Sequence, residues 1–157
     1  MVPDLLPGSF ARLRWLKARE RELLPTRYVH AVFTLPRELA PLALQNKRLI
    51  YNLLFHASAE TLLEVARNPR HLGAEIGFFS VLHSWNQRLQ FHPHIGVLSR
   101  VFRGKFVAGL RNAFHRGELQ FHGELLPLAY PRAFAAWLRV LFRHHWVVYS
   151  KPPFRRS

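Results

Sequence analysis

The sequence predicts an α+β domain in which an antiparallel sheet is flanked by helices. Segments with the composition of strands are interspersed among segments of helical periodicity, without the strict strand–helix alternation that is typical of a parallel sheet. Two apolar segments joined by a five-residue polar link indicate a hairpin, which is an antiparallel unit. With 157 residues, 49% of them hydrophobic, we expect one domain over residues 1–157 with a substantial core.

Strands are predicted where β-branched and aromatic residues cluster. Residues 28–35 end at Pro36, and residues 76–85 are apolar at consecutive positions, as in a central strand that is buried on both faces. A polar link over residues 86–90 leads to the second strand of the hairpin, which contains His92 and His94. The last predicted strand covers residues 146–149.

Helices are predicted where apolar residues recur at intervals of three and four. Pro25, Asn68–Pro69 and Gly117 end the first three of them, and Ser99 is the expected N-cap of the third. A break near Ala57–Ser58 is compatible with the pattern of the second. The four predicted helices cover residues 7–24, 41–68, 99–116 and 131–144.

The charge of the chain favours a polyanionic partner. Lys and Arg number 23 against 9 Asp and Glu, which gives a net charge of +14. Such a charge suits nucleic acid or an anionic membrane surface. Nineteen of the basic residues are Arg, whose planar fork fits phosphate, although GC-rich coding also raises the share of Arg.

Several classes of site and compartment are disfavoured. The chain has no Cys, so disulfides, thiolate zinc sites and Cys nucleophiles are excluded within it. No uncharged apolar run approaches the ~18 residues of a membrane span, and the first residues lack the pattern of a signal peptide. We therefore expect a soluble cytoplasmic protein that does not bind a membrane.

The segment Phe91-His-Pro-His-Ile-Gly96 contains the strongest candidate for a metal site. On a strand, His92 and His94 would point to the same face, and two neutral imidazoles form a simple metal-binding pair. His83 is a candidate third ligand by proximity only, and Glu75 is near the same predicted strand. The alternative is that these are ordinary half-buried histidines in a chain with ten of them.

The supply of nucleophiles and carboxylates is poor. No two tyrosines lie three or four residues apart, so no pair shares one helix face, and we assign none as a nucleophile. Asp4 is the only Asp, which argues against a two-metal nuclease. The four tyrosines are Tyr28, Tyr51, Tyr130 and Tyr149.

A series of motifs in a fixed order resembles a known family, over about residues 12–154. The chain is similar to the rolling-circle insertion-sequence transposases of the two-tyrosine HUH class. The motifs are Tyr28–Pro36, Asn46, Tyr51–Phe55, Thr61–Leu62, His71–Gly77, Val81–Trp85, His92–His94, Leu98–Phe106 and Trp146–Phe154.

This resemblance implies an HUH-nuclease fold with a His-hydrophobic-His metal pair on a central strand. It implies a divalent metal, Mg²⁺ or Mn²⁺, and a single-stranded DNA substrate that is nicked through tyrosyl–DNA intermediates during transposition. His94 matches the first His of the metal pair, and His92 matches the His that flanks it.

The chain departs from the family pattern in three places. The family motif His-Pro-His-Val-His ends here in Gly96, which has no ligating side chain. Gly96-Val97 joins almost directly to Leu98-Ser-Arg100, which indicates an internal deletion across the active strand. The Cys-rich zinc-binding region expected before Leu16 and the tyrosine nucleophiles expected after Phe154 are both absent. These departures predict a catalytically inactive remnant.

Two further alternatives remain open. The first is a non-enzymatic module that binds single-stranded nucleic acid through basic and aromatic side chains. The second is a remnant metal site of His83, His92 and His94. Loss of a strand would also leave an exposed sheet edge, which favours self-association or association with an intact transposase. The expected DNA-contacting residues are Arg88, Arg100, Arg103, Lys105 and Lys151.

Overall fold

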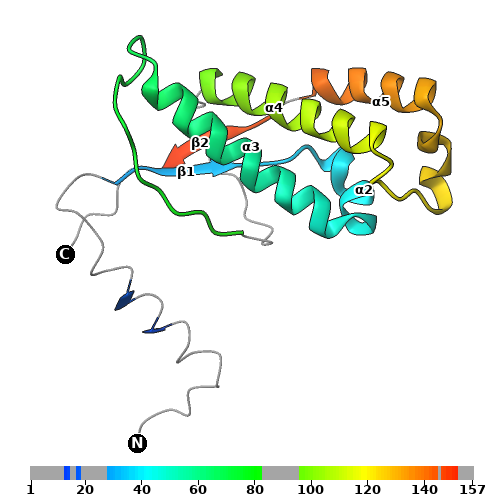
Figure 1. Ribbon diagram of the computed structural model, residues 1–157, viewed down its shortest axis with the longest axis horizontal. Helices are drawn as coiled ribbons and strands as arrows, with labels where there is room; N and C mark the ends of the chain where they lie inside the picture. Colours follow the sequence, from blue (N-terminus) through cyan, green and yellow to red (C-terminus); the bar gives the residue numbers. More distant parts are fainter. Residues whose placement is uncertain (1–12, 15–16, 19–27, 83–95, 145, 152–157) are drawn as a thin grey trace, which may run out of the picture. The chain divides into compact units, whose positions relative to one another are not determined.

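The chain divides into two compact units, and the larger one, called the main unit below, runs from His30 to Lys151. The computed structural model describes residues 13–14, 17–18, 28–82, 96–144 and 146–151 (Figure 1). The predicted helix over residues 7–24 falls mostly outside the described residues, and the four residues of it that are described are helical. The elements described in the main unit are β1 (His30–Phe33), η1 (Arg37–Leu39), α2 (Ala40–Gln45), α3 (Lys47–Arg67), α4 (Gly96–His115), η2 (Gly123–Ala129), α5 (Pro131–Arg143) and β2 (Val148–Lys151).

The sheet joins the two ends of the main unit. Strands β1 and β2 pair antiparallel, with Val32 opposite Tyr149. Thr34 extends the pairing, since its backbone N–H and its side-chain hydroxyl both donate to the carbonyl oxygen of Val147, at 3.0 and 2.8 Å. The first and last predicted strands are therefore confirmed, with shifted bounds, as the two strands of an α+β structure.

The predicted central strand over residues 76–85 is wrong for the part that the structure describes. Residues 75–82 have no regular secondary structure, and Phe78, Val81 and Leu82 are 40 to 52% exposed. A strand needs a partner for its backbone N–H and C=O groups. Among the described residues, β1 and β2 pair only with each other. The predicted hairpin partner, with His92 and His94, lies outside the described residues, so apolar composition alone misled the prediction.

The predicted second helix is broken at Asn46 and not near Ala57–Ser58. Within α3 the hydroxyl of Ser58 donates to the carbonyl of Phe55, and that of Thr61 donates to the carbonyl of Ala57, at 3.0 and 2.6 Å. These bonds satisfy the polar side chains inside the helix, so the chain continues without a break. The predicted end at Asn68 is confirmed, because Asn68 is the C-cap.

Helix α4 begins at Gly96, earlier than the predicted cap at Ser99. The Ser99 hydroxyl lies inside the helix and accepts a hydrogen bond from the backbone N–H of Val148 at 3.2 Å, which ties α4 to β2. The helix ends at His115, and Gly117 follows with φ +68°, a left-handed conformation that favours glycine. The predicted helix over residues 131–144 is confirmed as α5.

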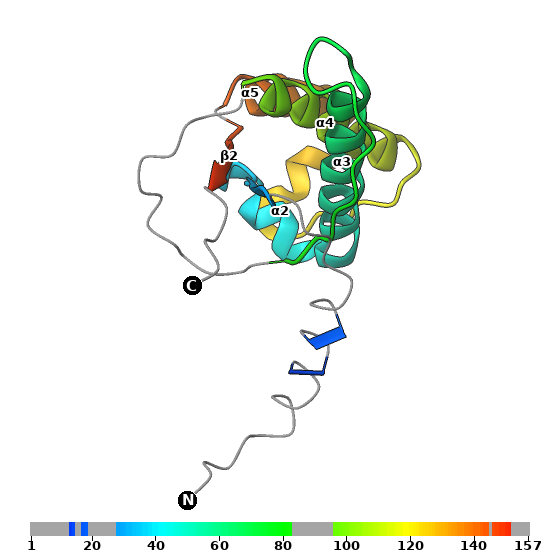
Figure 2. The same cartoon turned by 90° about the vertical axis from the view of Figure 1, so that its left-hand side faces the viewer.

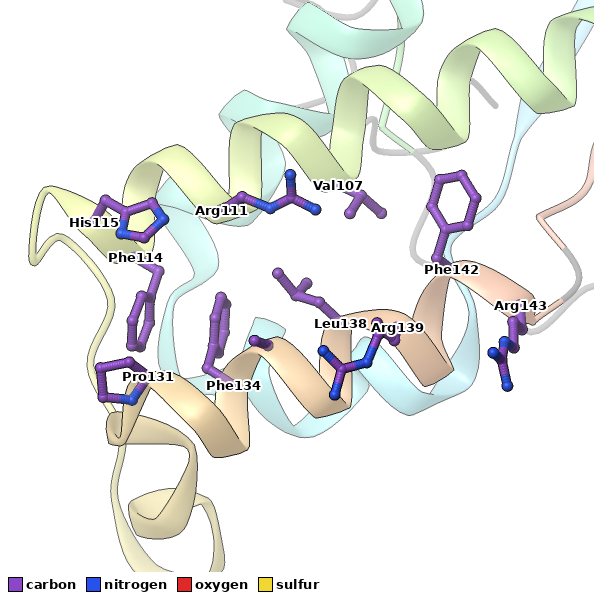
Figure 3. A pocket seen from close by; sticks show the side chains of 11 residues that line it. Val107, Arg111, Phe114, His115, Pro131, Phe134, Leu138, Arg139, Phe142 and Arg143 are labelled. Atoms are coloured by element: carbon purple, nitrogen blue, oxygen red, sulfur yellow. The ribbon is translucent and has the colours of Figure 1, made fainter.

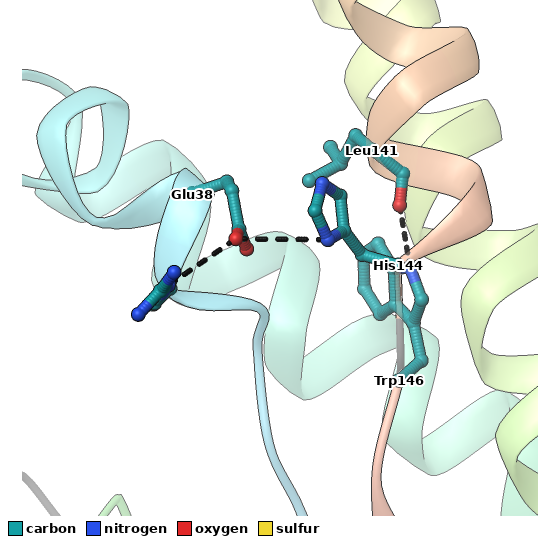
Figure 4. Close-up of polar contacts among 5 residues, drawn as sticks. Glu38, Leu141, His144 and Trp146 are labelled. Atoms are coloured by element: carbon teal, nitrogen blue, oxygen red, sulfur yellow. Dashed lines mark hydrogen bonds and ion pairs between the residues drawn. The ribbon is translucent and has the colours of Figure 1, made fainter.

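The core lies where the sheet meets the helices, and α4 runs between α3 and α5 (Figure 2). Phe102 and Phe106 of α4 are fully buried, and both pack on Trp146, with ring centroids 5.7 and 5.4 Å away. The indole N–H of Trp146 donates to the carbonyl of Leu141 at 3.0 Å (Figure 4), so the buried ring leaves no unpaired donor.

No single helix among the described residues is long and apolar enough to cross a membrane; only the pair η2 and α5, bent by 104°, meets that requirement by length and composition.

Two polar side chains, those of Asn46 and Glu38, make contacts that hold segments distant in the sequence together. Asn46 is buried between α2 and α3, and its amide nitrogen donates to the carbonyls of Leu42 and Gln120, at 3.1 and 2.8 Å. Its amide oxygen accepts the N–H of Gln120 at 2.8 Å. Near the end of α5, His144 Nδ1 lies 3.6 Å from Glu38 (Figure 4). The main cause that lowers the pKa of Glu38 is a hydrogen bond from its own backbone N–H. Desolvation opposes this shift, and the charge of His144 together with the hydrogen bond and charge of Arg37 lowers the pKa further.

Candidate nucleic-acid interface

A groove of about 530 Å³ runs between α4 and α5. Side chains from the two helices face each other across it (Figure 3). Its apolar lining is aromatic and aliphatic, and its polar lining consists of Arg and His side chains. The lining residues are Val107, Arg111, Phe114 and His115 of α4, and Pro131, Phe134, Ala135, Leu138, Arg139, Phe142 and Arg143 of α5.

Helical periodicity explains why the basic residues gather there. On α4, Arg103, Val107, Arg111 and His115 are each four residues apart, so they lie along one face. On α5, Arg139 and Arg143 are also four apart. Packing of α4 against α5 then brings three arginines from two segments of the chain to one groove.

Among the described residues, no acidic side chain pairs with the arginines that line this groove. Neither α4 nor α5 contains an Asp or Glu. Arg111, Arg139 and Arg143 are exposed, and none of the three forms an ion pair with another described residue. The ion pairs of the described chain involve other basic groups: Arg37 with Glu38, Arg116 with Glu118, His144 with Glu38, and Lys105 with Glu60 and Glu64. A cleft that is lined by positive charges alone concentrates positive potential, which attracts anions.

Aromatic rings form both ends of the groove lining. Phe114 and Phe134 stack face to face at one end, with centroids 4.1 Å apart and planes 8° apart (Figure 3). Phe142 stands at the other end and is 40% exposed. The guanidinium of Arg103 lies 4.1 Å from the centroid of the Phe142 ring, and its Nη1 donates to the Phe142 carbonyl at 3.2 Å.

The predicted DNA-contacting residues are dispersed. Arg100 is exposed on α4, and Arg103 is held against Phe142 at the end of the groove. Lys151 is the last residue of β2, opposite His30, and Arg88 lies outside the described residues. Arg111, Arg139 and Arg143 were not among the predicted DNA contacts. The eight-residue spacing from Arg103 to Arg111, which is two steps of four along one helix face, was the signal that could have indicated one of them.

Lys105, the other predicted DNA contact on α4, is not available to pair with a phosphate, because two carboxylates of α3 neutralise its charge. Its Nζ lies 2.8 Å from Glu64 and 3.5 Å from Glu60. The hydrogen bond to Glu64, and then the charges of both glutamates, raise the pKa of Lys105 despite partial burial. A raised pKa means that the pair stabilises the fold at neutral pH and loses this contribution as the pH rises through the folded pKa, above 10.5.

We therefore expect Lys105→Met to change affinity for single-stranded DNA by less than about twofold, since a paired cation releases few counterions from DNA. Fluorescence anisotropy with a labelled oligonucleotide measures this. The matched variant is Arg111→Met on the same helix, which we expect to weaken binding about fivefold, the contribution of one phosphate contact at 0.1 M salt. Equal losses of DNA affinity in the two variants would show that the ion pairs with Glu60 and Glu64 do not prevent Lys105 from contacting DNA.

The predicted metal ligands His83, His92 and His94 lie outside the described residues. Gly96, which replaces the last His of the family motif, is the first residue of α4. Among the described residues, no group of three or more His, Asp and Glu could hold a metal ion, and Glu75 is exposed. Of the tyrosines, Tyr149 is buried in β2, whereas Tyr28 and Tyr130 are exposed.

Two transposases are similar to this chain, whereas no protein-family model and no solved structure matches it. The putative transposase y4qJ of Sinorhizobium fredii (strain NBRC 101917 / NGR234) is 46% identical over 173 residues, which cover 93% of this chain and 44% of that protein. The transposase for insertion sequence element IS801 of Pseudomonas savastanoi pv. phaseolicola is 34% identical over 88 residues, which cover 56% of this chain and 20% of that protein.

The alignment with the first relative is longer than the part of this chain that it covers. Since 93% of 157 residues is about 146, about 27 of the 173 aligned positions have no counterpart in this chain. The chain also spans less than half the length of either relative. Over nearly all of its own residues, the chain is thus similar to a transposase, with internal positions missing.

Proposed function

We propose that this chain is a DNA-binding protein derived from a rolling-circle insertion-sequence transposase of the HUH class, and that it holds single-stranded DNA without cutting it. The observation that carries the proposal is the groove between α4 and α5, where aromatic surface lies beside three arginines that form no ion pair with another described residue. Similarity to two transposases supports DNA as the polyanion. The net charge of +14 supports it as well.

A single strand suits this groove better than a duplex. Proteins that bind single strands combine a positively charged groove with aromatic rings on which unpaired bases stack. The groove has both, from Arg111, Arg139 and Arg143 and from Phe142. In a duplex the bases are stacked within the helix, so only the phosphates would reach these side chains.

Loss of cleavage follows from the metal-binding motif. The second His of the family pair is Gly96 here, and that position opens a helix. The missing internal positions of the alignment are consistent with a deletion in the same region. A metal that is held by one imidazole of the pair would be too weakly bound to polarise a scissile phosphate.

The binding half of the proposal is tested by titrating a labelled single-stranded oligonucleotide at several salt concentrations. Three phosphate contacts predict a slope of log affinity against log salt of about −2, because each contact on a single strand contributes about −0.7. An affinity that does not respond to salt would contradict the assignment of a polyanion-binding groove.

The cleavage half is tested separately with end-labelled single strands and either Mg²⁺ or Mn²⁺. We expect neither a shortened product nor a covalent protein–DNA adduct, at protein concentrations where binding is complete. A covalent adduct that disappears in a Tyr→Phe variant would show that the chain retains nuclease chemistry. Association with itself or with an intact transposase, and binding of a metal by His92 and His94, stay predictions from the sequence.

A further inference from the structure

We propose that Phe142 is a stacking platform for one unpaired base, and that Arg103 positions the ring for this role. The proposal rests on the proposed function, which it deepens by naming the contact that selects single strands. The ligand is one nucleotide unit of a single strand: its base lies on the Phe142 ring, and its phosphates lie at the arginines of the groove.

The ring has one covered face and one available face. Arg103 lies only 4.1 Å from the ring centroid, so its guanidinium covers one face of Phe142. The side chain is nevertheless 40% exposed and lines the groove. Figure 3 shows it standing between the two helices at one end of the groove. A base on the open face would complete a three-layer stack of guanidinium, phenyl ring and base.

Arg103 holds the ring in a fixed place. Its Nη1 donates to the backbone carbonyl of Phe142 itself at 3.2 Å, so one side chain contacts both the ring and the backbone of the same residue. Its Nε is buried and has no hydrogen-bond partner among the described residues. Burying an unpaired donor costs free energy. The unpaired Nε makes this placement of Arg103 unfavourable for the stability of the fold. We therefore attribute the placement to the contact of the guanidinium with the Phe142 ring.

The arginines lie where the phosphates of that nucleotide would be. Arg139 is three residues before Phe142, and Arg143 follows it directly, both on α5. They are one helical turn apart, about 5 to 6 Å, so they can contact successive phosphates on either side of the stacked base. Arg111 reaches the groove from α4, on the opposite side (Figure 3). The platform thus has cations on both sides and no acidic residue on either helix.

The experiment compares two 12-mer single strands of equal charge, oligothymidylate and a strand of abasic sites, by fluorescence anisotropy at fixed salt. We expect the wild-type protein to bind oligothymidylate on the order of tenfold more tightly, the worth of one base on an aromatic ring. Phe142→Ala should remove most of this difference without weakening binding to the abasic strand. Phe142→Trp should preserve it, and Val140→Ala, which is exposed on the same helix but does not line the groove, should not change it.

The outcomes separate this inference from the proposed function. Salt-dependent binding of both strands with equal affinity in the wild-type protein overturns the platform and leaves the proposed function standing; this comparison needs no variant. Absence of any binding overturns both. A tenfold preference that persists in Phe142→Ala assigns the base to another ring and overturns the inference, provided that circular dichroism shows the variant to be folded. A single-stranded RNA 12-mer bound more tightly than DNA would contradict DNA as the ligand.

Discussion

Replacing Arg111, Arg139 and Arg143 together by Gln will weaken affinity for single-stranded DNA by about 100-fold at 0.1 M salt. Each phosphate contact contributes about −0.7 to the slope of log affinity against log salt. Three contacts therefore contribute about two decades between 1 M and 0.1 M salt. The three side chains are exposed and make no ion pair with a described residue, so their loss should leave the fold intact. Gln keeps part of the aliphatic stem, which preserves apolar contacts.

The measurement is a salt titration of the triple variant beside the wild-type protein, in which the slope should approach zero. The matched control replaces Arg48, Arg67 and Arg70 by Gln, three exposed arginines away from the groove, and lowers the net charge by the same amount. We expect the control to lose less than about fivefold, by weaker long-range attraction alone. Similar losses in both triple variants would mean that DNA binds diffusely over the basic surface and not in the groove.

Asn46→Ala will destabilise the folded unit by about 3 kcal/mol, since the wild-type side chain makes three hydrogen bonds of about 1 kcal/mol each and the variant leaves buried groups unpaired. The bonds lost are those to the Leu42 carbonyl and to both backbone groups of Gln120. Asn46 is 7% exposed, so water does not readily replace them. Urea unfolding followed by circular dichroism measures the free energy, and a fall in Tm of roughly 10 °C is expected.

The neighbouring amide gives a matched control. Gln45 makes an analogous pair of hydrogen bonds with the backbone of His122, at 3.1 and 2.9 Å, but these bonds are exposed to solvent. Water can take their place, so we expect Gln45→Ala to cost less than about 1 kcal/mol. If Gln45→Ala proved as damaging as Asn46→Ala, burial would not be the reason for the importance of Asn46.

Local signals in the sequence were enough where an element's limits are set by its own residues. Gly117 adopts the left-handed conformation that ends α4, Asn68 caps α3, and Pro131 opens α5, all as predicted. They were not enough for residues 76–82, whose apolar composition fits a strand but which join neither of the two strands of the described sheet. Nor could they place the break at Asn46, because its amide is satisfied by Gln120, 74 residues away in the sequence.

The candidate site was likewise predicted in part by the sequence and in part only by contacts between distant segments. Charge and the order of motifs indicated a DNA-binding relative of transposases, which the similarity to two transposases supports. The predicted contact Lys105 proved to be paired with Glu60 and Glu64 of α3, a contact between helices that no local pattern reveals.

The sequence by itself determined the basic charge, the family resemblance that its motifs carry, and the helical face that holds Arg103 and Arg111. Only the tertiary structure decided which of the described cations pair with carboxylates and which do not. It also decided that α4 and α5 place their arginines around one aromatic groove. The physical reason is that composition and periodicity fix which side chains share one face of a helix, whereas packing between distant segments fixes which of those faces meet.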